Sequence, residues 1–181
     1  MDSGFDEHFM RMALREAARA ADEGEVPLGA VVVAPAVLEP AHDGHPAVFS
    51  DDPTLAKILG RAHNMPEGLK DATAHAEMLA MSAAFQAVGD WRLGGARLYV
   101  TKEPCPMCAG AIVLARLDAV VWGVSDPKRG GGTTFGIFDH PGINHHPEIV
   151  TGVCEAESKA ILQLFFQERR RSPSAARTSC D

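Results

Sequence analysis

The chain has 181 residues and lacks the features that mark membrane-bound or secreted proteins. It contains no uninterrupted apolar run of about 18 residues, the length that a membrane-spanning helix needs. Its first residues are acidic, and no apolar stretch follows them, so a secretory signal is not expected. Only four cysteines are present, two of them scattered, which disfavours a disulfide framework. We therefore expect a soluble, cytoplasmic protein with no membrane contact.

Net positive charge is also missing, and aromatic residues make up only 6% of the chain. The net charge is −7, which by itself disfavours nucleic-acid binding. The acidity is local: residues 1–60 hold four Lys or Arg against eleven Asp or Glu, whereas residues 61–181 hold thirteen of each. A basic cluster at residues 169–171 ends the last segment with helical periodicity. The uneven distribution therefore weakens the electrostatic objection to an RNA substrate.

Helical and extended segments alternate along the chain, which is 46% hydrophobic. Apolar periodicity and start or stop residues predict helices over 4–23, 74–88, 106–115 and 155–171. Short apolar runs rich in β-branched residues predict strands at 28–33, 98–101 and 119–123, with a candidate return strand at 55–62. This alternation predicts the α/β class, a sheet with helices on its faces.

The length suits a single domain, which we expect to span residues 1–171. Residues 34–54 contain four prolines and show no period, so we interpret them as a long inserted hairpin loop. Residues 127–134 are glycine-rich and loop-like. The small, polar residues 172–181 are expected to form a disordered tail.

Two short segments carry metal-binding chemistry. His75 is the first, and Cys105 with Cys108, in Pro104-Cys105-Pro106-Met107-Cys108, is the second. The two cysteines lie three residues apart at a predicted helix start, so both sulfurs can face one point. Zinc takes four tetrahedral ligands in structural sites, but three plus a water in catalytic sites. Because Cys154 and Cys180 lack close companions, the sequence predicts a three-ligand, catalytic zinc site.

Glu77 adds a carboxylate two residues after His75. Near a helix start it can reach a water on the metal, take its proton and return it to a leaving amine. A closed zinc knuckle would need a fourth ligand. A thioredoxin-like redox pair would leave His75 and Glu77 without a role. Both alternatives therefore explain the two segments less completely than a hydrolytic zinc site.

His-x-Glu followed by Pro-Cys-x-x-Cys resembles the signature of the cytidine deaminase-like zinc deaminases. Within that superfamily the chain looks most like the bacterial tRNA adenosine deaminases of the TadA type. The likeness covers residues 5–171 apart from the long loop, and its carrying segments are 25–32, 101–111, 122–128, 140–145 and 165–170. The resemblance implies a three-layer α/β/α fold with a central mixed sheet of about five strands.

The resemblance also implies a set of site residues and a substrate. His75, Cys105 and Cys108 match the Zn²⁺ ligands, and Glu77 matches the proton shuttle. The positions that match substrate-pocket residues are Leu28, Asn64, Ala76 and Asp126, and those that match contacts to a tRNA anticodon stem-loop are Lys128, Phe165, Arg169 and Arg170. The implied reaction converts adenosine at the tRNA wobble position to inosine. A homodimer with the site near the subunit interface is implied as well.

Other interpretations stay open at the sequence level. The long acidic loop favours a deaminase of a free base or nucleoside, such as guanine, cytosine or cytidine, with a covered pocket. A catalytically silent RNA-binding subunit is a third possibility.

Single residues also have other interpretations. Asn64 alone is compatible with a turn cap, and the arginine run with a solvated helix end. The histidines at 140, 145 and 146 favour a structured loop over a second metal site. Lys102 replaces a residue that is usually apolar, so we expect its chain at a strand end or directed outward.

Overall fold

The computed structural model describes residues 3–35 and 52–171. Expectations for most of the inserted loop and for the tail at 172–181 lie outside these residues. The ends of the expected loop belong to regular structure. Residues 34 and 35 complete strand β1 (Gly29–Pro35), and residues 53 and 54 lie in a short 3-10 helix, η1 (Pro53–Leu55).

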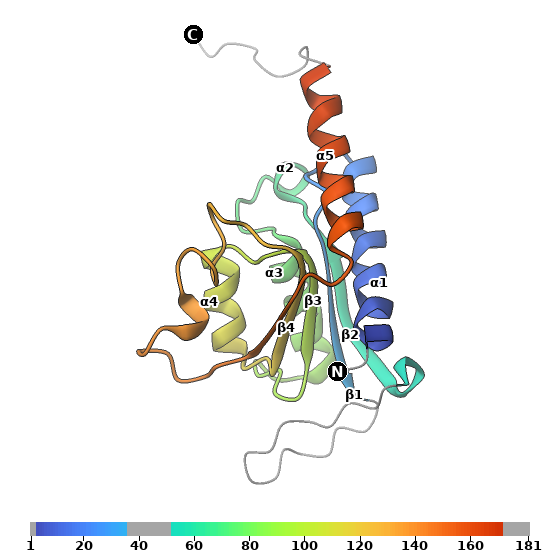
Figure 1. The fold of residues 1–181 in the computed structure, drawn as a ribbon. Helices are drawn as coiled ribbons and strands as arrows, with labels where there is room; N and C mark the ends of the chain where they lie inside the picture. Colours follow the sequence, from blue (N-terminus) through green and yellow to red (C-terminus); the bar gives the residue numbers. More distant parts are fainter. Residues whose placement is uncertain (1–2, 36–51, 172–181) are drawn as a thin grey trace.

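One five-stranded mixed sheet forms the centre of the molecule (Figure 1). Its order is β2 (Ala56–His63), β1, β3 (Arg97–Lys102), β4 (Ala119–Val124) and β5 (Glu148–Thr151). Strand β1 runs antiparallel to both β2 and β3, whereas β3, β4 and β5 are parallel to one another. The antiparallel pairing of β1 and β2 agrees with a hairpin, and the parallel pairs agree with helical crossovers. The predicted mixed sheet is confirmed.

Helices cover both faces of the sheet and complete three layers (Figure 1). Helices α1 (Ser3–Asp22) and α5 (Glu155–Arg171) lie on one face, and α3 (Ala76–Val88) and α4 (Pro106–Ala115) on the other. Two short elements, α2 (Pro66–Leu69) and η2 (Ile137–Asp139), lie in the connections. Strand residues alternate between the faces, as a pleated strand requires. Val32, Leu98 and Trp122 face α3 and α4, whereas Val31 and Tyr99 face α1.

Three contacts fix the position of α1 against the sheet. A Cβ atom on Gly29 would lie 2.0 Å from the carbonyl oxygen of Ala13, so only glycine permits this close approach. The buried hydroxyl of Tyr99 donates a hydrogen bond of 2.8 Å to Asp6 on α1. Arg97 lies 3.7 Å from the same carboxylate and forms an ion pair with it. Helix α1 is therefore held against the sheet by polar contacts as well as by apolar packing.

The sequence interpretation missed one strand, β5. This edge strand is largely exposed, with only Val150 half-buried, so it has neither the apolar run nor the alternation that marks a buried strand. Helix α3 begins at Ala76 rather than Ala74, because His75 still has extended backbone geometry. No helix among the described residues is long and apolar enough to cross a membrane.

Candidate active site

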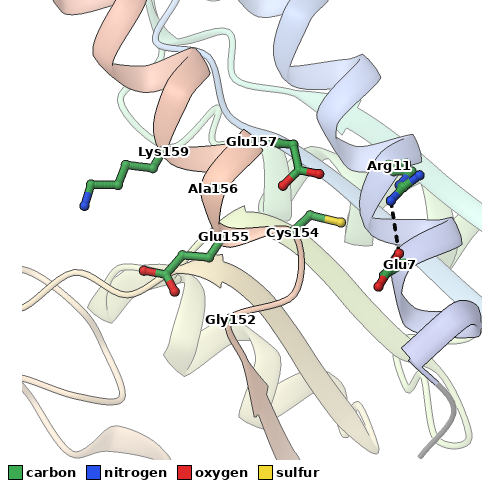
Figure 2. Close-up of a pocket in the computed structure, with 8 residues that line it drawn as sticks. All are labelled: Glu7, Arg11, Gly152, Cys154, Glu155, Ala156, Glu157 and Lys159. Carbon is green, nitrogen blue, oxygen red and sulfur yellow. Dashed lines mark hydrogen bonds and ion pairs between the residues drawn. The ribbon is translucent and has the colours of Figure 1, made fainter.

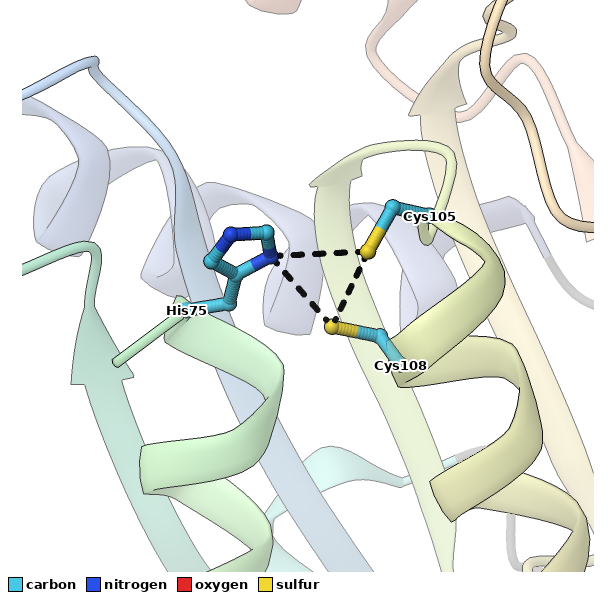
Figure 3. A group of neighbouring side chains, drawn as sticks. All are labelled: His75, Cys105 and Cys108. Atoms are coloured by element: carbon cyan, nitrogen blue, oxygen red, sulfur yellow. Dashed lines mark hydrogen bonds between the residues drawn. The ribbon is translucent and has the colours of Figure 1, made fainter. Parts of the chain in front are cut away.

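The starts of two helices form the candidate site. His75 is the N-cap of α3 and Cys105 is the N-cap of α4, where Pro106 occupies the first turn. Neither N-cap side chain makes a capping hydrogen bond to its helix. Both side chains therefore remain available to point toward a common centre, and Cys108 joins them from the first turn of α4 (Figure 3).

The three predicted ligand atoms form a compact triangle (Figure 3). The Nδ1 atom of His75 lies 3.5 Å from the Sγ atoms of both Cys105 and Cys108, and the two sulfurs are 3.7 Å apart. A tetrahedral zinc ion with Zn–S bonds of about 2.3 Å and Zn–N bonds of about 2.0 Å gives edges of about 3.8 and 3.5 Å. The donor set and its spacing therefore fit one face of a tetrahedral metal site, with the fourth corner open. Among the residues that the structure describes, this is the one cluster able to hold a metal ion.

Hydrogen bonding within the triangle sets the protonation of its members. The thiol of Cys108 lowers the pKa of Cys105 to about 3, and His75 acts in the same direction. The hydrogen bond between the two cysteines, together with burial, raises the pKa of Cys108. The hydrogen bond between His75 and Cys105 raises the pKa of His75. These pKa shifts favour a thiolate at Cys105 beside a thiol at Cys108. A bound cation favours both thiolates.

Glu77 lies in the first turn of α3 and is 3% exposed. One of its carboxylate oxygens, Oε2, has no hydrogen-bond partner within the described chain. Burial raises the pKa of this carboxyl group, and the nearby His75 opposes the shift. An unsatisfied buried carboxylate is costly unless a ligand completes it. Its position beside two predicted ligands suits a proton carrier for a group held at that centre.

Asn64 is the second buried side chain with an unsatisfied oxygen, its Oδ1 atom. The residue follows β2, and its backbone amide donates a hydrogen bond of 2.9 Å to the carbonyl of Leu28. The next amide, that of Met65, donates to Ala74 over 2.9 Å, which fixes the end of β2 beside the start of α3. Because Oδ1 accepts no hydrogen bond, Asn64 does not act as a turn cap. The structure thus brings Leu28, Asn64 and the buried Ala76 to the same end of the sheet.

The loop after β4 carries Asp126 and Lys128. Asp126 forms an ion pair with Lys102 at the end of β3 and accepts hydrogen bonds from the amides of Lys128 and Arg129 at 3.0 and 3.1 Å. Partial burial acts to raise the pKa of Asp126, but these donors outweigh it and hold the pKa below its usual value. Lys102 thus lies at a strand end, as expected. The side chain of Lys128 is exposed.

The four predicted RNA-contacting residues differ in accessibility. Arg169 and Arg170 are exposed near the end of α5. Phe165, however, is 7% exposed, and its ring lies 5.2 Å from the guanidinium carbon of Arg169. The ring of Phe165 therefore packs inside the chain and supports Arg169, and its contact with RNA stays a prediction. Phe166 is 42% exposed and is the ring that faces solvent.

The histidines after the glycine-rich segment build a loop rather than a metal site. His145 and His146 contact the carbonyl oxygens of Leu117 and Phe138 at 2.6 and 3.0 Å. His140 accepts a hydrogen bond from the amide of Gly142. None of the three belongs to a metal-ligating cluster in the described part of the chain. All three imidazoles thus take part in hydrogen bonds within or next to this loop.

A separate hollow of about 550 Å³ lies between α1 and the start of α5, on the face opposite α3 and α4 (Figure 2). It contains acidic and basic side chains together with Cys154. Burial raises the pKa of Cys154, although Arg11 opposes this. The thiol form is therefore favoured, and Cys154 is not a member of the metal-ligating cluster.

Sequence reasoning missed Glu103, which is 4% exposed and adjoins the Pro-Cys segment. Its carboxylate accepts hydrogen bonds from the loop of residues 126–133. The residue directly before a metal-ligand motif is a weak sequence signal, because the bonding partners are 23 to 30 residues away in the chain.

Known deaminases resemble this chain over nearly its whole length. The MafB19-like deaminase family matches residues 5–170. The tRNA-specific adenosine deaminase of Bacillus subtilis (strain 168) is 44% identical over 173 residues, which cover 95% of each chain. The chloroplastic tRNA(adenine(34)) deaminase of Arabidopsis thaliana is 40% identical, over 91% of this chain and 12% of that protein.

Solved structures of deaminases share the fold of this chain. A structure from a study of A-to-I editing by tRNA:A34 deaminases at the wobble position superposes with a TM-score of 0.72. It is 40% identical in sequence, and the match covers 86% of this chain and 99% of that one. The guanine deaminase of Bacillus subtilis superposes with a TM-score of 0.53 at 26% identity, with 97% of each chain covered.

Proposed function

This chain belongs to the MafB19-like deaminases and to the tRNA-specific adenosine deaminases, and we propose that it converts adenosine to inosine at the wobble position of tRNA. The reaction adds water at C6 of the base and releases ammonia. The observation that carries the proposal is the open triangle of His75, Cys105 and Cys108 beside the unsatisfied Glu77 carboxylate. The similarity to curated tRNA deaminases, which extends over nearly the whole chain, also supports the proposal.

The three ligands are assigned to Zn²⁺, which suits their chemistry and spacing. When bound, zinc lowers the pKa of a coordinated water to about 7 and so supplies the nucleophile at neutral pH. Glu77 would take one proton from the attacking water and give it to a ring nitrogen of the base. It would then carry the second proton of that water to the departing amine, which leaves as ammonia. Its unsatisfied Oε2 atom is the group that accepts this proton.

Recognition of the base is assigned to the end of β2. The unsatisfied Oδ1 atom of Asn64 accepts a hydrogen bond from the target base, and Leu28 and Ala76 line the pocket. A base must leave the stack of its loop to reach such a site. The exposed cations Lys128, Arg169 and Arg170 contact backbone phosphates of the anticodon stem-loop and fix its register.

We further assign the working form to a homodimer in the cytoplasm, where an unmodified tRNA substrate is met. Helix α4, which supplies two ligands, exposes Leu114 at 70% of its surface. The neighbouring loop exposes Phe135 at 57%. Large exposed apolar side chains on neighbouring elements are typical of subunit interfaces. Light scattering on the purified chain, with Leu114→Glu as the disrupting variant, tests this assignment.

The substrate assignment is tested with zinc-loaded protein and nucleoside mass spectrometry. The substrates are an unmodified tRNA transcript with adenosine at the wobble position and a panel of free guanine, cytosine, cytidine and adenosine. We expect inosine in the transcript and no turnover of the panel. A transcript with guanosine at the wobble position is the matched control. Turnover of a free base with an unchanged transcript would assign the site to small molecules instead.

A further inference from the structure

The buried carboxylate of Glu103 connects the metal-ligand segment to the loop after β4. Its Oε2 atom accepts hydrogen bonds from the amide of Asp126 at 2.7 Å and the hydroxyl of Thr133 at 2.9 Å. Its Oε1 atom accepts hydrogen bonds from the amides of Thr133 and Gly132 at 2.7 and 3.2 Å. Four donors from the two ends of one loop thus converge on a side chain two residues before Cys105. Charge-assisted bonds of this kind are stronger than neutral ones.

The middle of the same loop is seated on the same segment. The amide of Gly131 donates to the carbonyl of Pro104 over 2.8 Å. A Cβ atom on Gly131 would lie 2.5 Å from the Cβ of Ala109 on α4, and one on Gly130 would lie 2.3 Å from Oε1 of Glu103. The loop therefore packs directly against the strand end and the helix that hold Cys105.

Asp126 receives a second restraint from the residue before Glu103. Its backbone amide is held by Glu103, and its carboxylate pairs with Lys102. The other carboxylate oxygen accepts the amides of Lys128 and Arg129, which orders the exposed tip of the loop. Lys102 and Glu103 thus hold Asp126 from both ends, and the position of Lys128 follows from that of Asp126.

We propose that Glu103 is a positioning residue that locks the loop of residues 125–134 to the metal-ligand segment and thereby sets the affinity for the RNA substrate. Its bonds fix Asp126 and Lys128 in register with the site, whereas the ligand atoms are placed by the helix starts themselves. Loss of the Glu103 bonds loosens the substrate-facing loop while the metal site stays formed. The part of this inference that concerns RNA rests on the proposed function.

Limited trypsin digestion of the zinc-loaded protein tests the lock without reference to activity. In Glu103→Gln an NH2 group replaces one of the two carboxylate oxygens. This group cannot accept a hydrogen bond from the backbone amide that faces it, so part of the network is lost. We expect cleavage after Lys128 and Arg129 to be about tenfold faster than in the wild type, since protease attack follows local opening. Glu25→Gln is the matched control, because Glu25 is buried and accepts a hydrogen bond of 2.7 Å from the backbone amide of Gly68 in helix α2, away from this loop. Equal cleavage in wild type and Glu103→Gln overturns the lock.

Inosine kinetics on a wobble-adenosine stem-loop test the consequence. We expect KM to rise about tenfold in Glu103→Gln with kcat changed less than about twofold and zinc content unchanged. A fall in kcat at constant KM contradicts the assignment. If that variant does not fold, Thr133→Val replaces it, and Thr133→Ser must restore the wild-type KM because it keeps the hydroxyl. A wild-type protein that makes no inosine refutes the proposed function, while the digestion result still decides the lock.

Discussion

The Nδ1 atom of His75 lies 3.5 Å from the Sγ atom of Cys105, although 30 residues separate them in the chain. The contact exists because α3 and α4 begin at the same end of the sheet. Each residue is an N-cap, so each side chain lies at the positive end of a helix dipole. That field favours thiolate at Cys105 and so prepares the site for a cation.

Metal content is the first prediction. The wild-type chain is expected to bind about one zinc, because three ligands of suitable spacing converge once. Cys105→Ser and His75→Ala are expected to lose it. Cys154→Ser is the matched control and keeps zinc, since Cys154 is outside the cluster. Elemental analysis decides the matter, and full zinc in both ligand variants would contradict the site.

Zinc affinity is expected to fall as the pH falls. In the metal-free protein, hydrogen bonding and burial keep Cys108 a thiol, and contact with Cys105 raises the pKa of His75. Zinc requires a Cys108 thiolate and a neutral His75, so binding releases protons and acid opposes it. Competition with a chelator of known proton affinity at about pH 6 and pH 8 measures the change. Equal affinity at the two pH values would count against this protonation scheme.

Glu77→Ala and Glu77→Gln are expected to keep zinc and lose turnover. Glu77 is a buried carboxylate beside the ligands but not one of them. Removal of a general acid–base group lowers kcat by about 100-fold or more. Single-turnover inosine formation with equal zinc content measures the effect. Near-normal rates in the zinc-loaded variants would refute its role as the proton carrier.

The pair of substitutions Arg169→Ala and Arg170→Ala is expected to weaken RNA binding without loss of zinc. Both side chains are exposed, and Arg169 is supported by the ring of Phe165. Loss of two phosphate contacts makes the salt dependence of log K shallower by about 2. Arg92→Ala is the control, because this exposed arginine packs on Trp91 instead. Unchanged affinity at low salt would remove the arginine pair from the interface.

Tyr99→Phe is expected to destabilise the fold while leaving the site intact. The change removes the 2.8 Å hydrogen bond to the buried Asp6 and leaves that carboxylate with fewer partners. The expected loss in the free energy of unfolding is about 1–3 kcal/mol, measured by urea denaturation. An unchanged denaturation midpoint, at equal m-value, would show that this bond contributes nothing net.

Much of the fold and of the candidate site was predictable from the sequence. The ligands and Glu77 lie in short motifs, so their spacing along the chain predicted a three-ligand site. The apolar runs of β1, β3 and β4 predicted their strands, and Pro106 predicted the first residue of α4. The recognition of the family is confirmed by the comparisons.

The features that were missed depend on contacts between distant residues. Strand β5 is an exposed edge strand that pairs with β4, and its own residues carry no strand pattern. The network of Glu103 joins residues 23 to 30 positions apart, and nothing local to Glu103 marks it. The burial of Phe165 rather than Phe166 depends on which side of α5 packs inward. Adjacent residues of a helix point in different directions, but their sequence alone does not tell which ring lies inside.

The most direct test of the central claim is the reaction in water enriched in ¹⁸O. Zinc-loaded protein is incubated with an unmodified tRNA transcript that has adenosine at the wobble position, and the inosine is analysed by mass spectrometry. We expect inosine at that position alone, one ¹⁸O atom in each inosine, and no product from the Glu77→Gln variant. An unchanged transcript, or inosine formed equally by both proteins, would contradict it.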